Sequence, residues 1–387
     1  MTTRAITAQV AVIGGGVVGA ALTHTLQHRG VDTVLLEADA DLAYSASGTN
    51  SGVLHTGFDS TPGQLETELI IRSAGIRPAI LDALGVPVIE TGAELVPHRS
   101  EDHEIIKRLA ENAATNGVEV KIRESDGALL VPGESITDPV AFTLALADSA
   151  TAAEARIELN ARVVGARTMG RKVVLGLEDG GAVTVQLVIN AAGLYADDIA
   201  RLFGDDSFEI YPRKGEFFVF ELPDGKALDH IVLPVPTKRT KGVLVFPTLD
   251  GHVVAGPTAV DLDDKDDWSV RPEAHREVLD KAVSNYPALE GLTPIAVYAG
   301  LRPAGRNTNY VIGVSGASDK LINVAAIRST GLSASLGIAA YVADLLPGLG
   351  IETTEQRAPT HVTEQAKLQR EWWRRTADRR TAKQSRR

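Results

Sequence analysis

QVAVIGGGVVGAALTHTLQHRGVDTVLLE, residues 9–37, is the segment from which the fold can be inferred. Its apolar start, residues 9–13, indicates a buried strand that runs directly into three glycines. Apolar positions spaced three and four residues apart predict a helix over 17–28, and Gly30 ends this helix. A second buried strand is predicted over 33–37. Strand, glycine turn, helix and strand form a βαβ unit, so we expect an α/β domain built on a parallel sheet.

The glycines of this segment, Gly14, Gly16 and Gly19, form a GxGxxG pattern between strand and helix. Gly14 permits the tight turn, Gly16 lets the backbone approach a pyrophosphate, and Gly19 lets the helix pack closely on the strand. The helix N-terminus then faces the phosphates with unpaired N–H groups. Glu37 ends the second strand, where a carboxylate accepts hydrogen bonds from a ribose. The pattern therefore predicts a dinucleotide site that favours FAD or NAD over NADP.

Composition narrows the kinds of protein and site to consider. A chain of 387 residues corresponds to about two domains, and 44% apolar residues suffice for a sizeable core. The absence of cysteine excludes disulfides, thiolate metal sites, cysteine-ligated iron–sulfur clusters and a flavin bound through cysteine; no metal site is predicted. The net charge of −11 argues against general nucleic-acid binding. No apolar run reaches the ~18 residues of a membrane span and residues 1–9 are no signal peptide, so we expect a cytoplasmic protein.

The rest of the chain mixes helices with strand-rich blocks. A short helix is predicted from residue 51, and longer helices are predicted over 65–84, 101–116, 139–155 and 329–346. Alternating apolar and polar residues between glycine turns predict antiparallel strands over 117–122, 156–193 and 208–259, and a last apolar strand is predicted over 320–327. The nucleotide-binding pieces are therefore expected to be separated in sequence by a sheet-rich region.

Residues 44–69, YSASGTNSGVLHTGFDSTPGQLETEL, resemble a segment of the flavoenzymes of the D-amino-acid oxidase superfamily, above all glycerol-3-phosphate dehydrogenases and L-2-hydroxyglutarate oxidases. The positions that match the family pattern are Asn50, Ser51, Gly52, His55, Gly57, Pro62, Gly63 and Leu65. Later segments also resemble the family, namely NAAGLYAD (190–197), PRKGEFFVF (212–220), FPTLDGHVVAGPTAVDLDDKDD (246–267), YAGLRPA (298–304) and AAIRSTGLSASLGIA (325–339).

This resemblance implies FAD as the cofactor and an α/β fold, in which an FAD-binding Rossmann-like domain carries an inserted, mainly antiparallel-sheet substrate domain. The expected division is an FAD-binding domain of residues 1–90, 140–205 and 300–350, a substrate domain of 91–139 and 206–299, and a basic C-terminal tail of 351–387. The residues expected to contact FAD are Gly14, Gly16, Val17, Val18, Gly19, Glu37, Ala38, Thr49, Asn50, Ser51, Gly52, Val163, Ala192, Gly193, Arg302, Gly331, Leu332 and Ser333.

The candidate catalytic residues follow from what hydride transfer to a flavin requires, which is an anchored substrate, a base and exclusion of water. Arg302 is the expected anchor, because a guanidinium pairs bidentately with a carboxylate or phosphate. His55 is the expected base, because imidazole can exchange a proton near neutral pH. Lys214 is a further candidate as an anion contact.

The last predicted helix has a role of its own in this scheme. Gly331 would point its N-terminus at the negative charge that a reduced flavin carries at N1 and O2. Ser329, Thr330 and Ser333 are the candidate caps of this helix.

Two departures from the family pattern leave the substrate open. Some glycerol-3-phosphate dehydrogenases place an arginine shortly after the glycine that follows the histidine, but here Gly57 is followed by Phe58 and Asp59. The cysteine-rich iron–sulfur extension of the anaerobic enzyme is also absent. Glycerol 3-phosphate is the first expectation, L-2-hydroxyglutarate or another 2-hydroxy acid the second, and an amino acid or amine the third. A non-catalytic flavoprotein subunit is the alternative of a different class. The electron acceptor could be oxygen, a quinone or a carrier protein.

The C-terminal tail differs in charge from the rest of the chain. Residues 367–387 hold nine basic and two acidic residues, a net +7, which leaves −18 for the remainder of the −11 chain. A helix is predicted over 364–387, with Leu368, Trp372 and Trp373 as its only large apolar residues. We expect the tryptophans to dock this helix on the acidic body, so that removal of the tail leaves flavin binding intact. The alternative is a weak contact with a membrane surface, which would make the protein peripheral.

Overall fold

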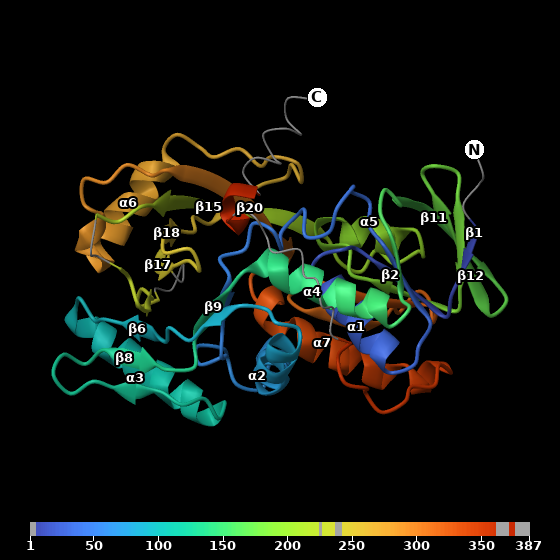
Figure 1. Ribbon diagram of the computed structural model, residues 1–387, viewed down its shortest axis with the longest axis horizontal. Coiled ribbons are helices and arrows are strands. Elements are labelled where there is room, and N and C mark those ends of the chain that lie inside the picture. The colour runs from blue at the N-terminus through green and yellow to red at the C-terminus, as the bar shows by residue number, and fades with distance from the viewer. Residues whose placement is uncertain (1–4, 224–226, 237–241, 361–370, 376–387) are drawn as a thin grey trace.

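The structure is a computed structural model that describes residues 5–223, 227–236, 242–360 and 371–375. Figure 1 shows two lobes side by side along the long axis, one built around a parallel sheet and one around a mainly antiparallel sheet. Among the described residues, no helix combines the length and the apolar character that crossing a bilayer requires.

The predicted βαβ unit is present and forms the centre of the first lobe. β2 (Val10–Ile13), α1 (Val17–His28) and β3 (Thr33–Leu36) follow one another, and every residue of both strands is buried. They belong to a six-stranded sheet of order β10 (Arg156–Glu158), β3, β2, β14 (Leu187–Asn190), β22 (Leu321–Ala325) and β21 (Val311–Val314). All neighbours are parallel except β21 and β22. The expected α/β class is confirmed.

Helices distant in sequence pack together on this sheet. α1 contacts both α4 (Pro139–Ala152) and α7 (Gly331–Leu345), and α7 also contacts α2 (Leu65–Ala83). The α2–α7 contact is close, because a Cβ on Gly337 would lie 2.1 Å from the carbonyl oxygen of Leu69. The first and last thirds of the chain therefore share one core.

Residues 156–193 are not one antiparallel block, so this prediction is wrong at both ends. β10 and β14 join the parallel sheet, where β14 is buried along its whole length. Only the middle of the block forms antiparallel strands, in a four-stranded sheet of order β1 (Ala5–Thr7), β13 (Ala182–Val185), β12 (Lys172–Leu177) and β11 (Val163–Met169).

The short helix predicted from residue 51 is also absent. Gly52 instead has a φ of +80°, and a Cβ there would lie 2.4 Å from the carbonyl oxygen of Thr137. The chain continues as a strand of the three-stranded sheet β4 (Val53–Leu54), β9 (Ser135–Thr137) and β5 (Val88–Ile89).

The second lobe is built on a nine-stranded sheet. Its order is β19 (Val260–Asp261), β15 (Ile210–Phe220), β18 (Val253–Gly256), β17 (Leu244–Pro247), β16 (Ile231–Val232), β6 (Ala93–Leu95), β8 (Leu129–Val131) and β7 (Lys121–Ile122), with β20 (Ala296–Gly305) paired to β15. α3 (Ser100–Thr115) and α6 (Ala274–Asn285) pack on this sheet, whereas α5 (Ala196–Arg201) contacts β14 and β22 of the parallel sheet. Within the described part of the nine-stranded sheet, only β16 and β6 pair in parallel, as expected of a mainly antiparallel domain. β20 runs without a break through residue 300, the expected domain boundary.

The described part of the tail, residues 371–375, packs against the second lobe. Trp372 and Trp373 are only 2% and 1% exposed, so the expected docking through the tryptophans is confirmed. The Trp372 ring meets the Tyr298 ring edge to face at 5.5 Å, and Tyr298 stacks on Phe217 at 4.9 Å. The rest of the predicted tail helix lies outside the described residues.

Candidate active site

A cavity of about 990 Å³ lies where the carboxyl ends of the parallel strands meet the second lobe. Gly14 after β2, Ala191 after β14 and Ala326 after β22 all line it. Ligands of open α/β sheets bind at this edge. From the second lobe, Arg213 and Arg302 reach the same cavity.

The glycine turn shows which glycines serve packing and which serve a ligand. A Cβ on Gly14 would lie 2.4 Å from the carbonyl oxygen of Ala191, and one on Gly19 would lie 1.8 Å from that of Gly14. A Cβ on Gly16 would approach only the Ser47 hydroxyl, at 3.1 Å, within the described structure. Because Gly16 lines the cavity, its bare backbone is explained by close approach of a ligand.

Glu37 is fixed at the wall of the cavity. Its two carboxylate oxygens accept hydrogen bonds from the amides of Gly15, at 2.6 Å, and Asp39, at 2.7 Å. Burial raises the pKa of Glu37, while these amides act in the opposite direction. The Glu37 carboxylate also gives a reason for glycine at position 15, because a Cβ there would lie 2.8 Å from Glu37 Oε2.

Most residues expected to contact FAD line this one cavity. They are Gly14, Gly16, Val17, Val18, Glu37, Ala38, Thr49, Asn50, Ser51, Val163, Ala192, Gly193, Arg302, Gly331 and Leu332. Gly19, Gly52 and Ser333 are not among the lining residues. The first two are explained by packing, and Ser333 Oγ instead accepts a hydrogen bond from His55 N at 2.9 Å.

The N-terminus of α7 opens on the cavity, with Gly331 and Leu332 in its lining. The expected cap is wrong, because the Thr330 side chain makes no capping bond and donates to Glu66 at 2.8 Å instead. The positive end of this 15-residue helix is therefore available to an anionic group in the cavity.

The turn at residues 191–193 is shaped by buried polar groups. Asn190 Nδ2 donates to the carbonyl oxygen of Ala196 at 2.7 Å and to Asn323 Oδ1 at 3.0 Å. Asn323 Nδ2 donates in turn to Asp205 at 2.9 Å. These bonds hold the ends of β14 and β22 in the register that brings Gly193 to the cavity.

His55 lines the cavity and is paired with a buried carboxylate. Its Nδ1 lies 2.8 Å from Oε2 of Glu134, a residue with no exposed surface. The other carboxylate oxygen accepts bonds from the amide and hydroxyl of Thr56, at 2.7 and 2.9 Å. Because an ionised carboxylate only accepts, Nδ1 carries the proton and Nε2 becomes the basic nitrogen of the ring.

Arg302 also lines the cavity, and backbone carbonyls hold it. Its Nε donates to Arg213 O at 3.1 Å, and Nη2 donates to Lys214 O at 3.1 Å and Thr258 O at 2.8 Å. In the described structure no carboxylate is hydrogen-bonded to it, and Nη1 makes no hydrogen bond. Burial, with Arg213 as the next cause, lowers the pKa of Arg302 to about 10, so it stays protonated at neutral pH.

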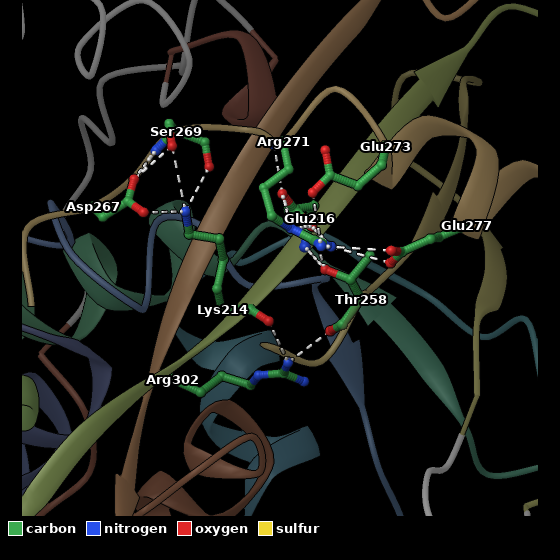
Figure 2. Close-up of polar contacts among 9 residues, drawn as sticks. All are labelled: Lys214, Glu216, Thr258, Asp267, Ser269, Arg271, Glu273, Glu277 and Arg302. Atoms are coloured by element: carbon green, nitrogen blue, oxygen red, sulfur yellow. Dashed lines mark hydrogen bonds and ion pairs between the residues drawn. The ribbon is translucent and has the colours of Figure 1, made fainter. Parts of the chain in front are cut away.

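The structure does not bring Lys214 to the cavity, so its expected anion contact is corrected. Side chains alternate along β15, and Arg213 and Gly215 line the cavity while Lys214 faces away. Lys214 Nζ bonds Asp267 Oδ2 at 2.8 Å and Ser269 O at 2.9 Å, as Figure 2 shows. Arg213 and Glu134 are the functional candidates that the sequence missed. Strand alternation could have indicated Arg213, but no motif marks Glu134.

Comparisons with known proteins agree with this geometry. The glycerol 3-phosphate dehydrogenase of Caloramator mitchellensis is 29% identical over 369 residues, covering 90% of this chain and 76% of the relative. The L-2-hydroxyglutarate dehydrogenase of Escherichia coli (strain K12) is 29% identical over 266 residues, covering 64% of this chain and 63% of the relative. A structure of reduced L-alpha-glycerophosphate oxidase from Mycoplasma pneumoniae with FAD bound has a TM-score of 0.85 at 25% identity, covering 93% of this chain and 100% of that one.

The family model described as FAD dependent oxidoreductase matches residues 9–345, from the glycine turn to the end of α7. FAD is therefore the cofactor, and the predicted D-amino-acid oxidase resemblance is confirmed. The chain belongs to the family of FAD dependent oxidoreductases.

Proposed function

We propose that this enzyme oxidises the secondary alcohol of a small anionic substrate, with glycerol 3-phosphate as the first candidate. One observation carries the proposal: a carboxylate-paired histidine and a half-buried arginine, to which no carboxylate of the described residues is hydrogen-bonded, line the same cavity as the glycine turn. The reaction needs a base and an anion site beside the cofactor, and these two residues supply them.

The residues present fit FAD. The Gly16 backbone and the first turn of α1 would receive the pyrophosphate, and Glu37 would accept hydrogen bonds from the ribose. The N-terminus of α7 would face the negative end of the isoalloxazine. When bound, FAD supplies the acceptor for a hydride.

His55 would take the hydroxyl proton of the substrate at Nε2. Glu134 holds Nδ1 protonated and stabilises the imidazolium that results. The carboxylate does not need to accept a proton, because Thr56 and His55 already donate to both of its oxygens. Glu134 is therefore proposed as a positioning residue for the base.

Arg302 would bind the anionic group through Nη1 and the cavity-facing side of its guanidinium. Arg213 and Arg328 also line the cavity and lie close enough to lower the pKa of Arg302. Arg213 is paired with Asp261 at 2.6 Å, and Arg328 lies 3.9 Å from Glu66. This cationic end of the cavity favours a phosphate or carboxylate.

L-2-hydroxyglutarate or another 2-hydroxy acid is the second candidate. Phe58 and Asp59 line the cavity where some glycerol-3-phosphate dehydrogenases have an arginine. This cavity thus lacks one expected phosphate contact, which favours a carboxylate substrate. An amino acid or amine is the third candidate substrate. The acceptor that reoxidises the flavin is oxygen, a quinone or a carrier protein.

Anaerobic bleaching of the flavin absorbance tests the proposal directly. Glycerol 3-phosphate, L-2-hydroxyglutarate, other 2-hydroxy acids and amino acids are added separately to the oxygen-free holoenzyme. We expect glycerol 3-phosphate to bleach the flavin most rapidly. A faster reaction with hydroxyglutarate would replace the first candidate by the second, and reaction with amino acids alone would overturn the alcohol reaction. Reoxidation with air or a soluble quinone then identifies the acceptor.

The anchor is tested by Arg302→Lys, which keeps the charge and loses the planar fork. We expect kcat/KM to fall by about 30- to 1000-fold while FAD content is unchanged. Arg306→Lys is the matched control, because Arg306 directly follows β20, the strand that carries Arg302, and pairs with Glu209 at 3.0 Å on the surface. Equal kinetics for both variants would show that Arg302 is not the anchor.

A further inference from the structure

We propose that Glu216, on the face of β15 turned away from the cavity, is a positioning residue for Arg302 and acts through Thr258. The proposal rests on the anchor role of Arg302 given above. Figure 2 shows Thr258 between Glu216 and Arg302. Glu216 is itself absent from the cavity lining, whereas Thr258 belongs to it.

Glu216 holds Thr258 at both its backbone and its side chain. The Thr258 hydroxyl donates to Glu216 Oε2 at 2.7 Å and accepts from Glu216 N at 3.0 Å. The Thr258 amide donates to Glu216 O at 3.3 Å. These three bonds fix the rotamer of Thr258 and the orientation of its peptide.

The carbonyl of Thr258 makes the shortest of the bonds that orient Arg302. It accepts from Arg302 Nη2 at 2.8 Å, against 3.1 Å for the carbonyls of Arg213 and Lys214. Those two carbonyls belong to β15, so they are fixed by the sheet. Thr258 lies between β18 and β19, outside both strands, and needs another restraint. Glu216 supplies it.

The carboxylate of Glu216 is fully buried and stays ionised. Burial acts to raise its pKa, but hydrogen bonds from Arg271 and Thr258 hold the pKa of Glu216 below its usual value. Arg271 donates to it from Nη2 at 2.7 Å and from its backbone amide at 2.7 Å. A charged acceptor bonds the Thr258 hydroxyl more strongly than a neutral one would.

A purely structural ion pair would predict something different from a positioning role. Loss of a structural pair lowers the stability of the whole protein and leaves the affinity for anions unchanged. Loss of a positioning pair changes where the Arg302 guanidinium lies, so anion affinity and KM change while kcat is nearly kept. Anion affinity and KM therefore separate the two roles.

The test uses Thr258→Val, Thr258→Ser and Glu216→Gln in the holoenzyme, with inorganic phosphate binding measured by calorimetry. We expect Thr258→Val and Glu216→Gln to weaken phosphate binding about tenfold and Thr258→Ser to restore it. KM for the substrate should follow the same order. Thr143→Val is the control, because it removes another buried hydroxyl, which donates to Pro139 O at 2.7 Å in α4, away from the cavity.

The outcomes separate this inference from the proposed function. Phosphate binding that is as tight in Thr258→Val and Glu216→Gln as in the parent overturns the positioning role. The same is true if Thr143→Val weakens binding equally. If the parent itself does not bind phosphate, or binds it equally after Arg302→Lys, the anchor role of Arg302 fails instead. FAD content and Tm show whether each variant is folded. If Thr258→Val does not fold, phosphate binding by Glu216→Gln tests the positioning role.

Discussion

Gly16 and Gly19, three positions apart, are glycine for unrelated reasons. Gly16 has φ −76° and ψ 176°, which any residue can adopt, and a Cβ there would approach only the Ser47 hydroxyl at 3.1 Å. Gly19 has no such freedom, because its Cβ would overlap the backbone of Gly14 at 1.8 Å. Without bound cofactor, the protein therefore has room for a side chain at position 16 but not at position 19.

Gly16→Ala should therefore fold normally and lose cofactor affinity. We expect the Tm of the apoprotein to be unchanged and the Kd for FAD to rise about tenfold or more. Gly19→Ala should lower the Tm of the apoprotein itself. Thermal unfolding with and without added FAD measures both effects. A normal FAD-dependent rise in Tm for Gly16→Ala would contradict the assignment of this glycine to the ligand.

His24, in the middle of α1, makes the stability of the protein sensitive to acid. Its ring is fully buried, neither nitrogen has a hydrogen-bond partner in the described structure, and the His28 ring lies 4.3 Å away. Burial, followed by His28, lowers the pKa of His24 from 6.5 to about 3. Below pH 6.5, His24 is protonated in the unfolded state but stays neutral in the folded state. The free energy of unfolding is therefore unaffected by His24 above pH 6.5 and decreases as the pH falls from 6.5 toward about 3.

His24→Phe should remove this acid sensitivity. The cost that His24 imposes at pH 5.5 is about 1.4 kcal/mol, one unit below its ordinary pKa. Urea unfolding at pH 7.5 and 5.5 should show a smaller difference between the two pH values in the variant than in the parent. The exposed His103, changed to Gln, serves as control. An identical pH difference in parent and His24→Phe would show that His24 is not the cause.

The candidate site illustrates what a sequence can and cannot indicate about single residues. His55 and Arg302 stand in recognisable motifs, and both reach the cavity. Glu134 has no motif and meets His55 only because β9 pairs with β4. Lys214 was misplaced because the motif does not say which face of β15 it occupies. The pairing that brings Glu134 to His55 cannot be read from one sequence. Strand alternation places Arg213 and Lys214 on opposite faces, but it does not say which face lines the cavity.

Among the elements, the tail segment 371–375 contributes most unexpectedly to the site. Trp372 supports Tyr298, which stacks on Phe217 in the cavity wall, and Trp373 packs on His252 at 5.3 Å. The burial of both tryptophans also removes them from any membrane surface. Membrane contact through the basic residues of the tail stays a prediction, and most of these residues lie outside the described ones.

These contacts give the tail a further role, beside the prediction that its removal leaves flavin binding intact. A chain ending at Arg370 loses both tryptophans from the core, and burial of each is worth about 3–5 kcal/mol in large-to-small substitutions. We expect a lower Tm and a raised KM for the substrate. A chain ending at Arg375 keeps them and should match the full chain in both measurements. Equal Tm values for the two truncated chains would show that the tryptophans do not stabilise the body.

The strand blocks were predicted less well than the helices. The helix predicted over 17–28 is α1, and that over 65–84 differs from α2 by one residue. By contrast, residues 156–193 alternate in sequence and yet supply β10 and β14 to the parallel sheet. Helix periodicity is local, whereas the partner of a strand is chosen by the rest of the fold.

Considered together, the two lobes meet at one cavity that both of them line. β15 and β20 pair over ten positions, from Ile210 with Gly305 to Val219 with Ala296. These two strands carry Arg213 and Arg302 to the cavity, so both arginines stand on the hydrogen-bonded backbone of paired strands. The sequence indicated the alternation of domains along the chain, but not that one strand would cross the expected boundary at residue 300.

The order of strands in the parallel sheet has a consequence for the protein during its synthesis. β2, β14 and β22 are neighbours in space, but the ribosome makes them as residues 10–13, 187–190 and 321–325. The glycine turn is therefore synthesised early, whereas α7, which completes the cavity, is synthesised only after most of the chain. We expect ribosome-bound chains arrested at residue 320 to capture no FAD, and full chains held by a C-terminal linker to capture it. Flavin fluorescence of purified nascent complexes measures this, and bright complexes at residue 320 would show that the early half of the site binds cofactor unaided. Until the last helix is translated, we expect this chain to be a flavoprotein without flavin, with a strand edge of its parallel sheet still unpaired.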